Sequence, residues 1–192
     1  SEMCIRDSGE KIATIINVDR DQAAKYLFFT TRNGIVKRTS TSQFSNIRTN
    51  GLKALKLRDG DELINVLRTS GEDEVIIGTH LGYSVRFKGA VVRDMGRAAA
   101  GVKGVNLREG DYVVGTSRID DSQEVLVISE NGLGKRTQAS EYPTKGRGGK
   151  GMKVMNVTER TGKLAGLTAV NGDEDLMVIT DTGVIIRTNV AN

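Results

Sequence analysis

The chain has 192 residues, 38% of them hydrophobic and 27% charged, with a formal net charge of +4 and a pI near 9.2. This balance is typical of a soluble chain with a sizeable core, and the moderately basic charge permits a polyanionic partner without requiring one. A run of about 18 apolar residues would predict a membrane span, and none is present, nor is a signal-peptide pattern.

Residues 1–8 match no later segment of the chain and resemble a translated sequencing adapter. We interpret them as a non-native leader and expect the folded domain to span residues 9–192; a genuine disordered terminus is the alternative. Cys4, the only cysteine, lies in this leader. The sequence therefore excludes an internal disulfide and weakly favours a reducing compartment.

A repeat of about 50 residues organises the rest of the chain. In each copy a glycine is followed four residues later by an arginine. These pairs are Gly34–Arg38, Gly82–Arg86, Gly132–Arg136 and Gly183–Arg187. Three copies carry a second landmark, Gly-x-Lys, which begins at Gly51, Gly101 and Gly151. A period of this length predicts stacked or radially arranged units that bury apolar faces against one another.

Each copy begins with two predicted strands joined by a tight turn. The first strand is rich in β-branched and apolar residues, and the second carries the recurring arginine. Asn33-Gly34 and Asn131-Gly132 are the strongest hairpin signals. The predicted first strands are 26–31, 74–79, 124–129 and 175–180, and the predicted second strands are 35–40, 84–89, 133–138 and 184–189.

Two further strands complete each predicted unit. The Gly-x-Lys landmark opens a third strand with alternating apolar positions, and a turn such as Asp59-Gly60-Asp61 leads into a fourth. The predicted third strands are 52–57, 102–107 and 152–157, and the fourth strands are 62–69, 112–119 and 163–170, with 12–18 as the fourth strand of an earlier copy. No helical period of useful length interrupts this pattern.

Four strands per unit predict an all-β, propeller-like fold with three complete four-stranded blades and two partial ones. We expect this arc to be a piece of a larger ring. The predicted units are about 9–22, 23–72, 73–122, 123–173 and 174–192.

Charge alternates in register with the repeat. Between Gln22 and Arg58 every charged residue is basic, whereas acidic residues dominate from Asp59 to Glu74, and the next two copies repeat this alternation. Equivalent positions in a ring of blades share one part of the surface. We therefore expect a curved basic track that neutralises phosphates without reading bases. A solvated face with ordinary local ion pairs is the alternative.

The candidate DNA contacts are the basic residues of this track. Lys145, Arg147 and Lys150 form the densest group, in a loop whose glycines allow the backbone to approach phosphate. The recurring arginines either line the track or are structural, since arginine stems also pack. The full candidate set is Lys37, Arg38, Arg48, Lys53, Arg86, Lys88, Arg93, Arg97, Lys103, Lys135, Arg136, Lys145, Arg147, Lys150, Lys153 and Arg187.

No catalytic residue, metal site or cofactor site is predicted. His80 is the only histidine, and we expect it to be a solvent-exposed turn residue, which leaves no zinc site or histidine-based triad. No Gly-x4-Gly-Lys-Ser/Thr string for nucleotide binding is present. The carboxylates fall in turns and acidic segments, where solvation is the expected state. Aromatic residues make up 4% of the chain, which disfavours a base-stacking platform for single strands.

Several strings resemble the C-terminal domain of the DNA gyrase A polypeptide, which belongs to the bacterial type IIA topoisomerases. They are Asn-Gly-x-x-Lys-Arg-Thr at 33–39 and 131–137, Asp-Gly-Asp-Glu-Leu-Ile at 59–64, Thr-Ser-Gly-Glu-Asp-Glu-Val at 69–75, Glu-Tyr-Pro-Thr-Lys at 141–145 and Val-Thr-Glu-Arg at 157–160. The likeness covers essentially all of residues 9–192. It implies a β-pinwheel, in which neighbouring blades exchange strands, and it implies that this chain holds the later blades.

The resemblance also implies a function. The family domain wraps duplex DNA for ATP-dependent negative supercoiling by a heterotetramer of gyrase A and gyrase B polypeptides, in the bacterial cytoplasm at the nucleoid. ATP and Mg²⁺ would belong to other parts of that enzyme, and no membrane is involved. The C-terminal domain of the topoisomerase IV A polypeptide and a propeller-like scaffold for protein partners are the alternatives.

One feature departs from the family pattern. The family's hallmark loop, Gln-Arg-Arg-Gly-Gly-Lys/Arg-Gly, lies in its first blade and is absent here. Residues 145–151, Lys-Gly-Arg-Gly-Gly-Lys-Gly, resemble that loop but fall in a later blade. We expect a degenerate relative of the hallmark that is able to touch DNA.

Overall fold

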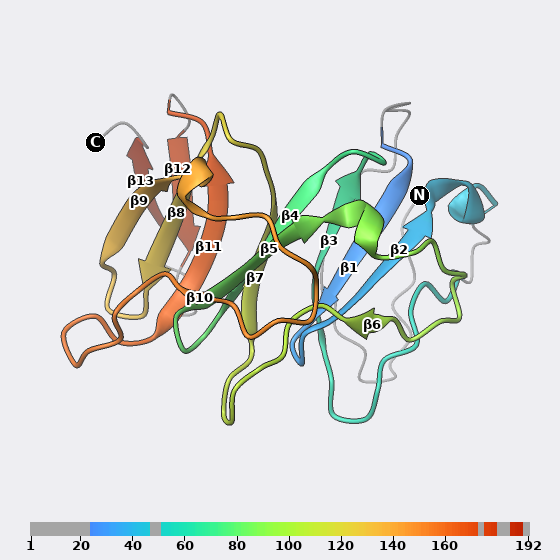
Figure 1. The fold of residues 1–192 in the computed structure, drawn as a ribbon, viewed down its shortest axis with the longest axis horizontal. Coiled ribbons are helices and arrows are strands. Elements are labelled where there is room, and N and C mark those ends of the chain that lie inside the picture. The colour runs from blue at the N-terminus through green and yellow to red at the C-terminus, as the bar shows by residue number, and fades with distance from the viewer. Residues whose placement is uncertain (1–23, 47–50, 173–174, 180–184, 190–192) are drawn as a thin grey trace.

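The structure is a computed structural model that describes residues 24–46, 51–172, 175–179 and 185–189, the last two ranges by their backbone only. Antiparallel β-sheets lie side by side across the molecule (Figure 1). This arrangement confirms the predicted all-β, propeller-like fold. The strands are β1 (Tyr26–Thr31), β2 (Ile35–Ser40), β3 (Leu63–Thr69), β4 (Glu74–Thr79), β5 (Tyr83–Lys88), β6 (Val102–Lys103), β7 (Val113–Ile119), β8 (Glu124–Ser129), β9 (Gly134–Gln138), β10 (Met152–Lys153), β11 (Leu164–Val170), β12 (Asp175–Ile179) and β13 (Ile185–Asn189).

The hairpin turns contain glycines with positive φ, a conformation that glycine adopts without strain. Gly34 has a φ of +83°. An aspartate from the following Asp-Gly-Asp turn supports this hairpin, because Asp61 Oδ1 accepts a hydrogen bond from the Asn33 N–H at 2.9 Å. Asp111 Oδ1 accepts the same bond from the Leu81 N–H in the next copy, also at 2.9 Å. These two turn carboxylates are therefore structural, whereas the charge pattern predicted solvated groups.

Each four-stranded sheet contains one strand from the following repeat. Blade 1 has the strand order β3-β1-β2-β6, and blade 2 has the order β10-β5-β4-β7. In blade 1 Val102 of β6 lies opposite Val36 of β2, and in blade 2 Met152 of β10 lies opposite Ser84 of β5. This is the strand exchange that the pinwheel resemblance implies. Since neither sheet coincides with one repeat, the unit boundaries remain a prediction.

The remaining strands form blade 3, with the order β11-β8-β9, and the hairpin β12-β13. Three short 3-10 turns follow second strands: η1 (Thr41–Phe44), η2 (Gly89–Val91) and η3 (Ala139–Glu141). The strand predicted at 12–18 lies outside the described residues.

The third strands are much shorter than the alternating pattern predicts. β6 and β10 contain two residues each, and 52–57 is not a strand. After Lys103, the N–H groups of Gly104 and Val105 both donate to the carbonyl of Gly34, so the chain crosses over the hairpin turn and leaves the ladder. Val105 is only 2% exposed. Its place in the pattern reflects packing into the core, not a longer strand.

The hydrophobic core lies between blades. Phe28 and Val36 of blade 1 share one cluster with Ile77 and Phe87 of blade 2, and the Phe28 and Phe87 ring centroids are 6.2 Å apart. A second cluster joins blade 2 to blade 3. Burial between units is what holds a repeat architecture together, because no single unit can cover its own apolar face.

The two edges of the sheets differ in their surroundings. β3, β7 and β11 lie at the edge where neighbouring blades touch, and Asn65 Nδ2 of β3 donates to the Thr116 carbonyl of β7 at 3.2 Å. The exchanged strands β6 and β10 lie at the opposite edge. We call this opposite edge, with its covering loops, the outer rim; it comprises residues 51–58, 92–108 and 142–158.

Candidate nucleic-acid interface

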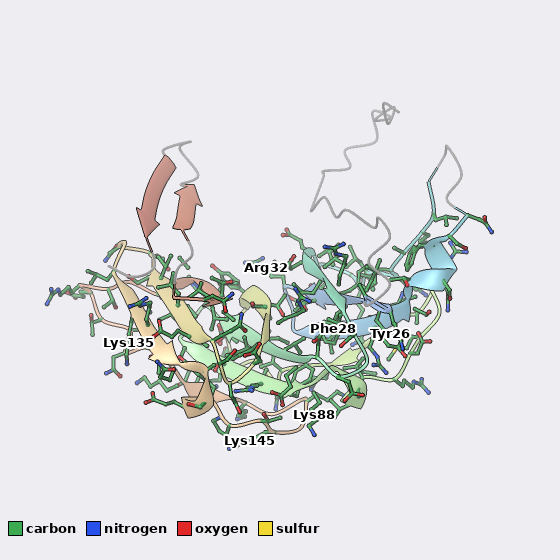
Figure 2. All side chains as sticks on the ribbon, turned by 90° about the horizontal axis from the view of Figure 1, so that it is seen from above. Tyr26, Phe28, Arg32, Lys88, Lys135 and Lys145 are labelled. Carbon is green, nitrogen blue, oxygen red and sulfur yellow. The ribbon has the colours of Figure 1, made fainter. Side chains whose placement is uncertain are left out.

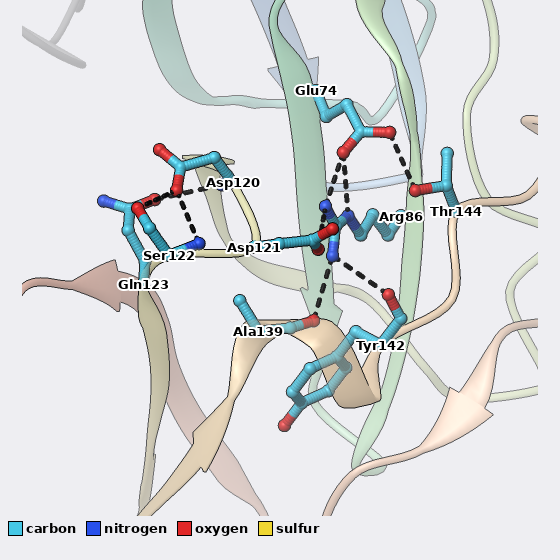
Figure 3. A network of polar contacts seen from close by, with 9 residues as sticks. All are labelled: Glu74, Arg86, Asp120, Asp121, Ser122, Gln123, Ala139, Tyr142 and Thr144. Atoms are coloured by element: carbon cyan, nitrogen blue, oxygen red, sulfur yellow. Dashed lines mark hydrogen bonds and ion pairs between the residues drawn. The ribbon is translucent and has the colours of Figure 1, made fainter.

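Arg86, on β5, is buried with 4% of its surface exposed. Its Nη1 donates to the carbonyls of Ala139 at 2.9 Å and Tyr142 at 3.0 Å, and its Nε donates to Glu74 Oε2 at 3.2 Å. Asp121 Oδ1 lies 2.9 Å from Nη2 (Figure 3). All three guanidinium nitrogens are thus engaged within the protein. The prediction that Arg86 contacts DNA is wrong, because this side chain joins blade 2 to blade 3.

Glu74 is held ionised in this network. Burial raises the pKa of Glu74, but hydrogen bonds from Thr144 and Arg86 and the positive charge of Arg86 outweigh burial and leave the pKa below its usual value. Thr144 Oγ1 donates to Glu74 Oε1 at 2.7 Å. The carboxylate therefore connects β4 to the loop that follows η3.

The arginines equivalent to Arg86 have other surroundings. Arg38 is 8% exposed, and its guanidinium lies 4.1 Å above the ring of Tyr26, so burial also excludes it as a DNA contact. Arg136 is exposed, with Nη1 3.2 Å from Glu124 Oε2. Arg187 lies on β13, where only the backbone is described.

Lys37, next to Arg38 on β2, is completely buried, with 0% of its surface exposed. Its Nζ donates to the carbonyl of Ala54 at 2.6 Å and to that of Arg97 at 2.7 Å. Burial, and then the charge of Arg97, lower the pKa of Lys37 from 10.5 to about 8. The prediction that Lys37 contacts DNA is wrong, because loops of the outer rim cover its ammonium group.

The lysines of the Gly-x-Lys landmark are exposed at equivalent places on the outer rim. These are Lys53, Lys103 and Lys153, the last two on β6 and β10. The following loop adds an arginine beside each of the first two: Arg97 Nη1 donates to the Lys53 carbonyl at 3.4 Å, and Arg147 Nη1 to the Lys103 carbonyl at 3.1 Å. Each of these two places therefore brings a lysine and an arginine together on the rim.

The glycine-rich loop contributes the densest group of rim cations. Lys145, Arg147 and Lys150 are all exposed. The loop lies against the preceding repeat, since the Gly148 N–H donates to the Gly104 carbonyl at 2.6 Å. Gly148 has a φ of +82°, which favours glycine at this position. The backbone thus fixes the loop while its charged side chains stay accessible.

Most of the other candidates are also accessible. Figure 2 shows Lys88, Lys135 and Lys145 along one outline of the molecule. Arg97 is half-buried, and Arg48 lies outside the described residues. The exposed candidates are Lys53, Lys88, Arg93, Lys103, Lys135, Arg136, Lys145, Arg147, Lys150 and Lys153.

Two arginines of the outer rim were not among the candidates. Arg108 Nη1 donates to the Lys150 carbonyl at 2.7 Å, and its guanidinium lies 3.5 Å from the centroid of the Tyr83 ring. Arg58 Nη2 donates to the Gly101 carbonyl at 3.2 Å. Both follow the landmark glycine at the same interval, and this shared position is the signal that identifies them. They join each Gly-x-Lys segment to the loop of the next repeat.

His80 is a packed residue, where the sequence predicted an exposed one. Its ring stacks on Tyr112 with centroids 4.3 Å apart, and its Nδ1 lies 3.2 Å from the Leu164 carbonyl. Among the described residues no three or more His, Cys, Asp or Glu side chains are grouped to hold a metal ion. The same part of the chain contains no helix long and apolar enough to cross a membrane.

Comparison with known proteins gives consistent matches. A family model described as the DNA gyrase C-terminal domain, a β-propeller, matches residues 25–70, 73–120, 123–171 and 174–192. The DNA gyrase A polypeptide of Streptococcus pyogenes serotype M3 is 72% identical over 187 residues. That alignment covers 97% of this chain and 23% of the relative, so the chain spans less than a quarter of the relative's length.

Two solved structures share the fold. The C-terminal domain of DNA topoisomerase IV matches with a TM-score of 0.87 and 28% identity, over 97% of this chain and 58% of that one. A DNA gyrase A C-terminal domain matches with a TM-score of 0.77 and 27% identity, over 86% of this chain and 56% of that one.

Proposed function

We propose that this chain, which belongs to the DNA gyrase C-terminal domain family, binds duplex DNA along its outer rim. The repetition of exposed cations at one edge of the sheets carries the proposal. Lys53, Lys103 and Lys153 take equivalent places in three repeats, and Arg97 and Arg147 accompany the first two. A row of cations with the spacing of the repeat suits a row of phosphates better than it suits a compact ligand.

The rim chemistry favours backbone contacts without base recognition. Lysine ammonium groups on flexible stems neutralise phosphates as point charges and carry no sequence information. The helical segments of the described chain are single 3-10 turns, too short to fill a major groove. Because successive blades turn about the inner edge, we expect the bound duplex to bend along the rim.

In the complete protein, we infer that this domain wraps DNA for ATP-dependent negative supercoiling. The partners in that account are the rest of the gyrase A polypeptide and the gyrase B polypeptide in a heterotetramer, acting on nucleoid DNA in the cytoplasm. Strand cleavage, ATP and Mg²⁺ belong to those other parts. This chain contributes binding and geometry to the reaction and no reacting group.

A gel-shift titration over a salt series tests the proposal. We expect similar affinities for duplexes of unrelated sequence and a log–log salt slope that corresponds to several released counterions. A protein-binding scaffold with an incidental charge pattern would show no binding at low salt or a flat slope, and either result would overturn the DNA-binding function.

A further inference from the structure

Lys37 connects two segments of the outer rim from inside the protein. Its buried ammonium group donates to the carbonyl of Ala54, next to Lys53, and to the carbonyl of Arg97. The two distances, 2.6 and 2.7 Å, are those of strong charge-assisted hydrogen bonds. The ring of Phe29 lies 5.5 Å from Nζ. Because Lys37 is completely buried, its ammonium group cannot itself meet a ligand on the rim.

Blade 2 achieves the same connection without a lysine. Val85 takes the place of Lys37, because Val36 and Ser84 pair with equivalent residues of the exchanged strands. The carbonyl of Gly104, equivalent to that of Ala54, receives the Gly148 N–H at 2.6 Å. Near Val85, blade 2 has a cavity of about 270 Å³, which is also lined by Tyr142, Gly149 and Met152 among others.

The remaining links between the two segments are weak in blade 1. The Lys56 N–H donates to the Ala99 carbonyl at 3.4 Å, and Arg97 Nη1 to the Lys53 carbonyl also at 3.4 Å. Both distances are at the long limit for a hydrogen bond. The equivalent links in blade 2 are shorter: 2.9 Å from the Asn106 N–H to Gly149, and 3.1 Å from Arg147 to Lys103. Blade 1 therefore depends on the ammonium group of Lys37, and blade 2 does not depend on its counterpart.

We propose that Lys37 is a positioning residue for DNA binding, which holds the segments of Lys53 and Arg97 in the place where they meet phosphate. This rests on the function proposed above. Lys37 itself touches no DNA. Its contribution passes through two backbone carbonyls to side chains that are accessible on the rim.

The test compares the full chain with its Lys37→Met variant, which nearly keeps the length of the side chain and removes the ammonium group. Amide hydrogen exchange, resolved by NMR without DNA, is expected to accelerate at Lys56 and Ala99 by about tenfold or more. Exchange at Asn106, the equivalent of Lys56, and at Ile76 in the core should not change. Val85→Met is the matched control, since it places the same side chain at the equivalent position of blade 2 and should leave exchange at Asn106 unchanged.

Duplex DNA affinity is then measured for the same proteins at one salt concentration. We expect roughly a threefold to tenfold loss for Lys37→Met and no loss for Val85→Met. If Lys37→Met does not fold, Lys37→Gln replaces it, because its amide is too short to reach both carbonyls and the same losses are expected.

The outcomes separate the two proposals. Unchanged exchange at Lys56 and Ala99 would overturn the role of Lys37 whatever the DNA result. Faster exchange with unchanged affinity, in a wild-type chain that binds DNA, would show that Lys37 is only structural and would overturn the positioning role. A wild-type chain that binds no duplex would overturn the proposed function instead, and the exchange data would still decide whether Lys37 anchors the rim.

Discussion

The guanidinium of Arg86 holds the carbonyl oxygen of Tyr142 at 3.0 Å, across the contact between blade 2 and the loop that follows η3. This loop carries Lys145, Arg147 and Lys150, so a buried arginine fixes the start of the segment with the densest rim charge. The recurring arginine is thus part of the scaffold in blade 2, and the cations that meet solvent are those of the loops and exchanged strands.

Replacement of Arg86 by methionine should destabilise the fold without altering the rim. The variant leaves the Glu74 carboxylate and two carbonyls without their donor, and breaking a buried ion pair in this way costs about 3 kcal/mol. Urea unfolding measures this loss. Arg118→Met is the control, because Arg118 is 61% exposed with its carboxylate partner 3.9 Å away, and it should change stability by less than about 0.5 kcal/mol. A folded Arg86→Met protein with weakened DNA affinity at full stability would contradict the structural role.

Two glycines of the same loop should respond differently to alanine. Gly151 has a φ of +80°, and an added Cβ would lie 2.4 Å from the Ser84 carbonyl oxygen, so Gly151→Ala should cost more than about 2 kcal/mol. An added Cβ at Gly149 meets no atom within 4 Å, and Gly149→Ala should stay within about 1 kcal/mol of the wild type. Thermal unfolding of both variants checks the difference, and equal melting temperatures would show that the exchanged strand β10 does not pack closely on β5.

The pKa of Lys37 predicts a dependence of stability on pH. Burial lowers this pKa to about 8 in the folded chain, so between pH 8 and the ordinary value of 10.5 the unfolded chain binds more protons. The contribution of Lys37 to the free energy of unfolding therefore rises with pH in this window, by up to about 1.4 kcal/mol per pH unit. Below pH 8 both states are protonated and the contribution is constant.

Urea unfolding at pH 8.0 and 9.5, for the wild type and for Lys37→Met, isolates this contribution from other titrating groups. We expect the wild type to gain stability relative to the variant between the two pH values. Parallel behaviour of the two proteins would mean that Lys37 titrates near its ordinary pKa and that its ammonium group is solvated.

The hairpins were predictable because their causes are local. β1 and β4 coincide with the predicted runs 26–31 and 74–79, since β-branched residues and a turn glycine act within a few residues of one another. The exchanged strands were not predictable in length. Val102 pairs with Val36 in the preceding repeat, and the alternation continues to Val105 although the backbone has already left the ladder. Only a contact across repeats distinguishes the two.

The candidate site was predictable by position in the repeat and not by local sequence. Lys37 and Lys135 both lie in the string Lys-Arg-Thr after an Asn-Gly turn. Lys37 is buried because the loop that contains Arg97 covers it, whereas Lys135 is exposed. The difference comes from a segment about sixty residues away in the chain, which no local pattern reports. The landmark lysines, in contrast, behave alike in all three repeats.

The central claim is that the outer rim neutralises DNA phosphates, and one measurement tests it most directly. This is the log–log salt slope of duplex binding for a triple variant, Lys53→Ala with Lys103→Ala and Lys153→Ala. Arg118→Ala is the control, because this exposed cation lies on β7, at the inner edge. Thermal unfolding confirms that both variants are folded. The account predicts a slope reduced by about 3 for the triple variant and the wild-type slope for the control. A triple variant that keeps the wild-type slope and affinity would contradict it.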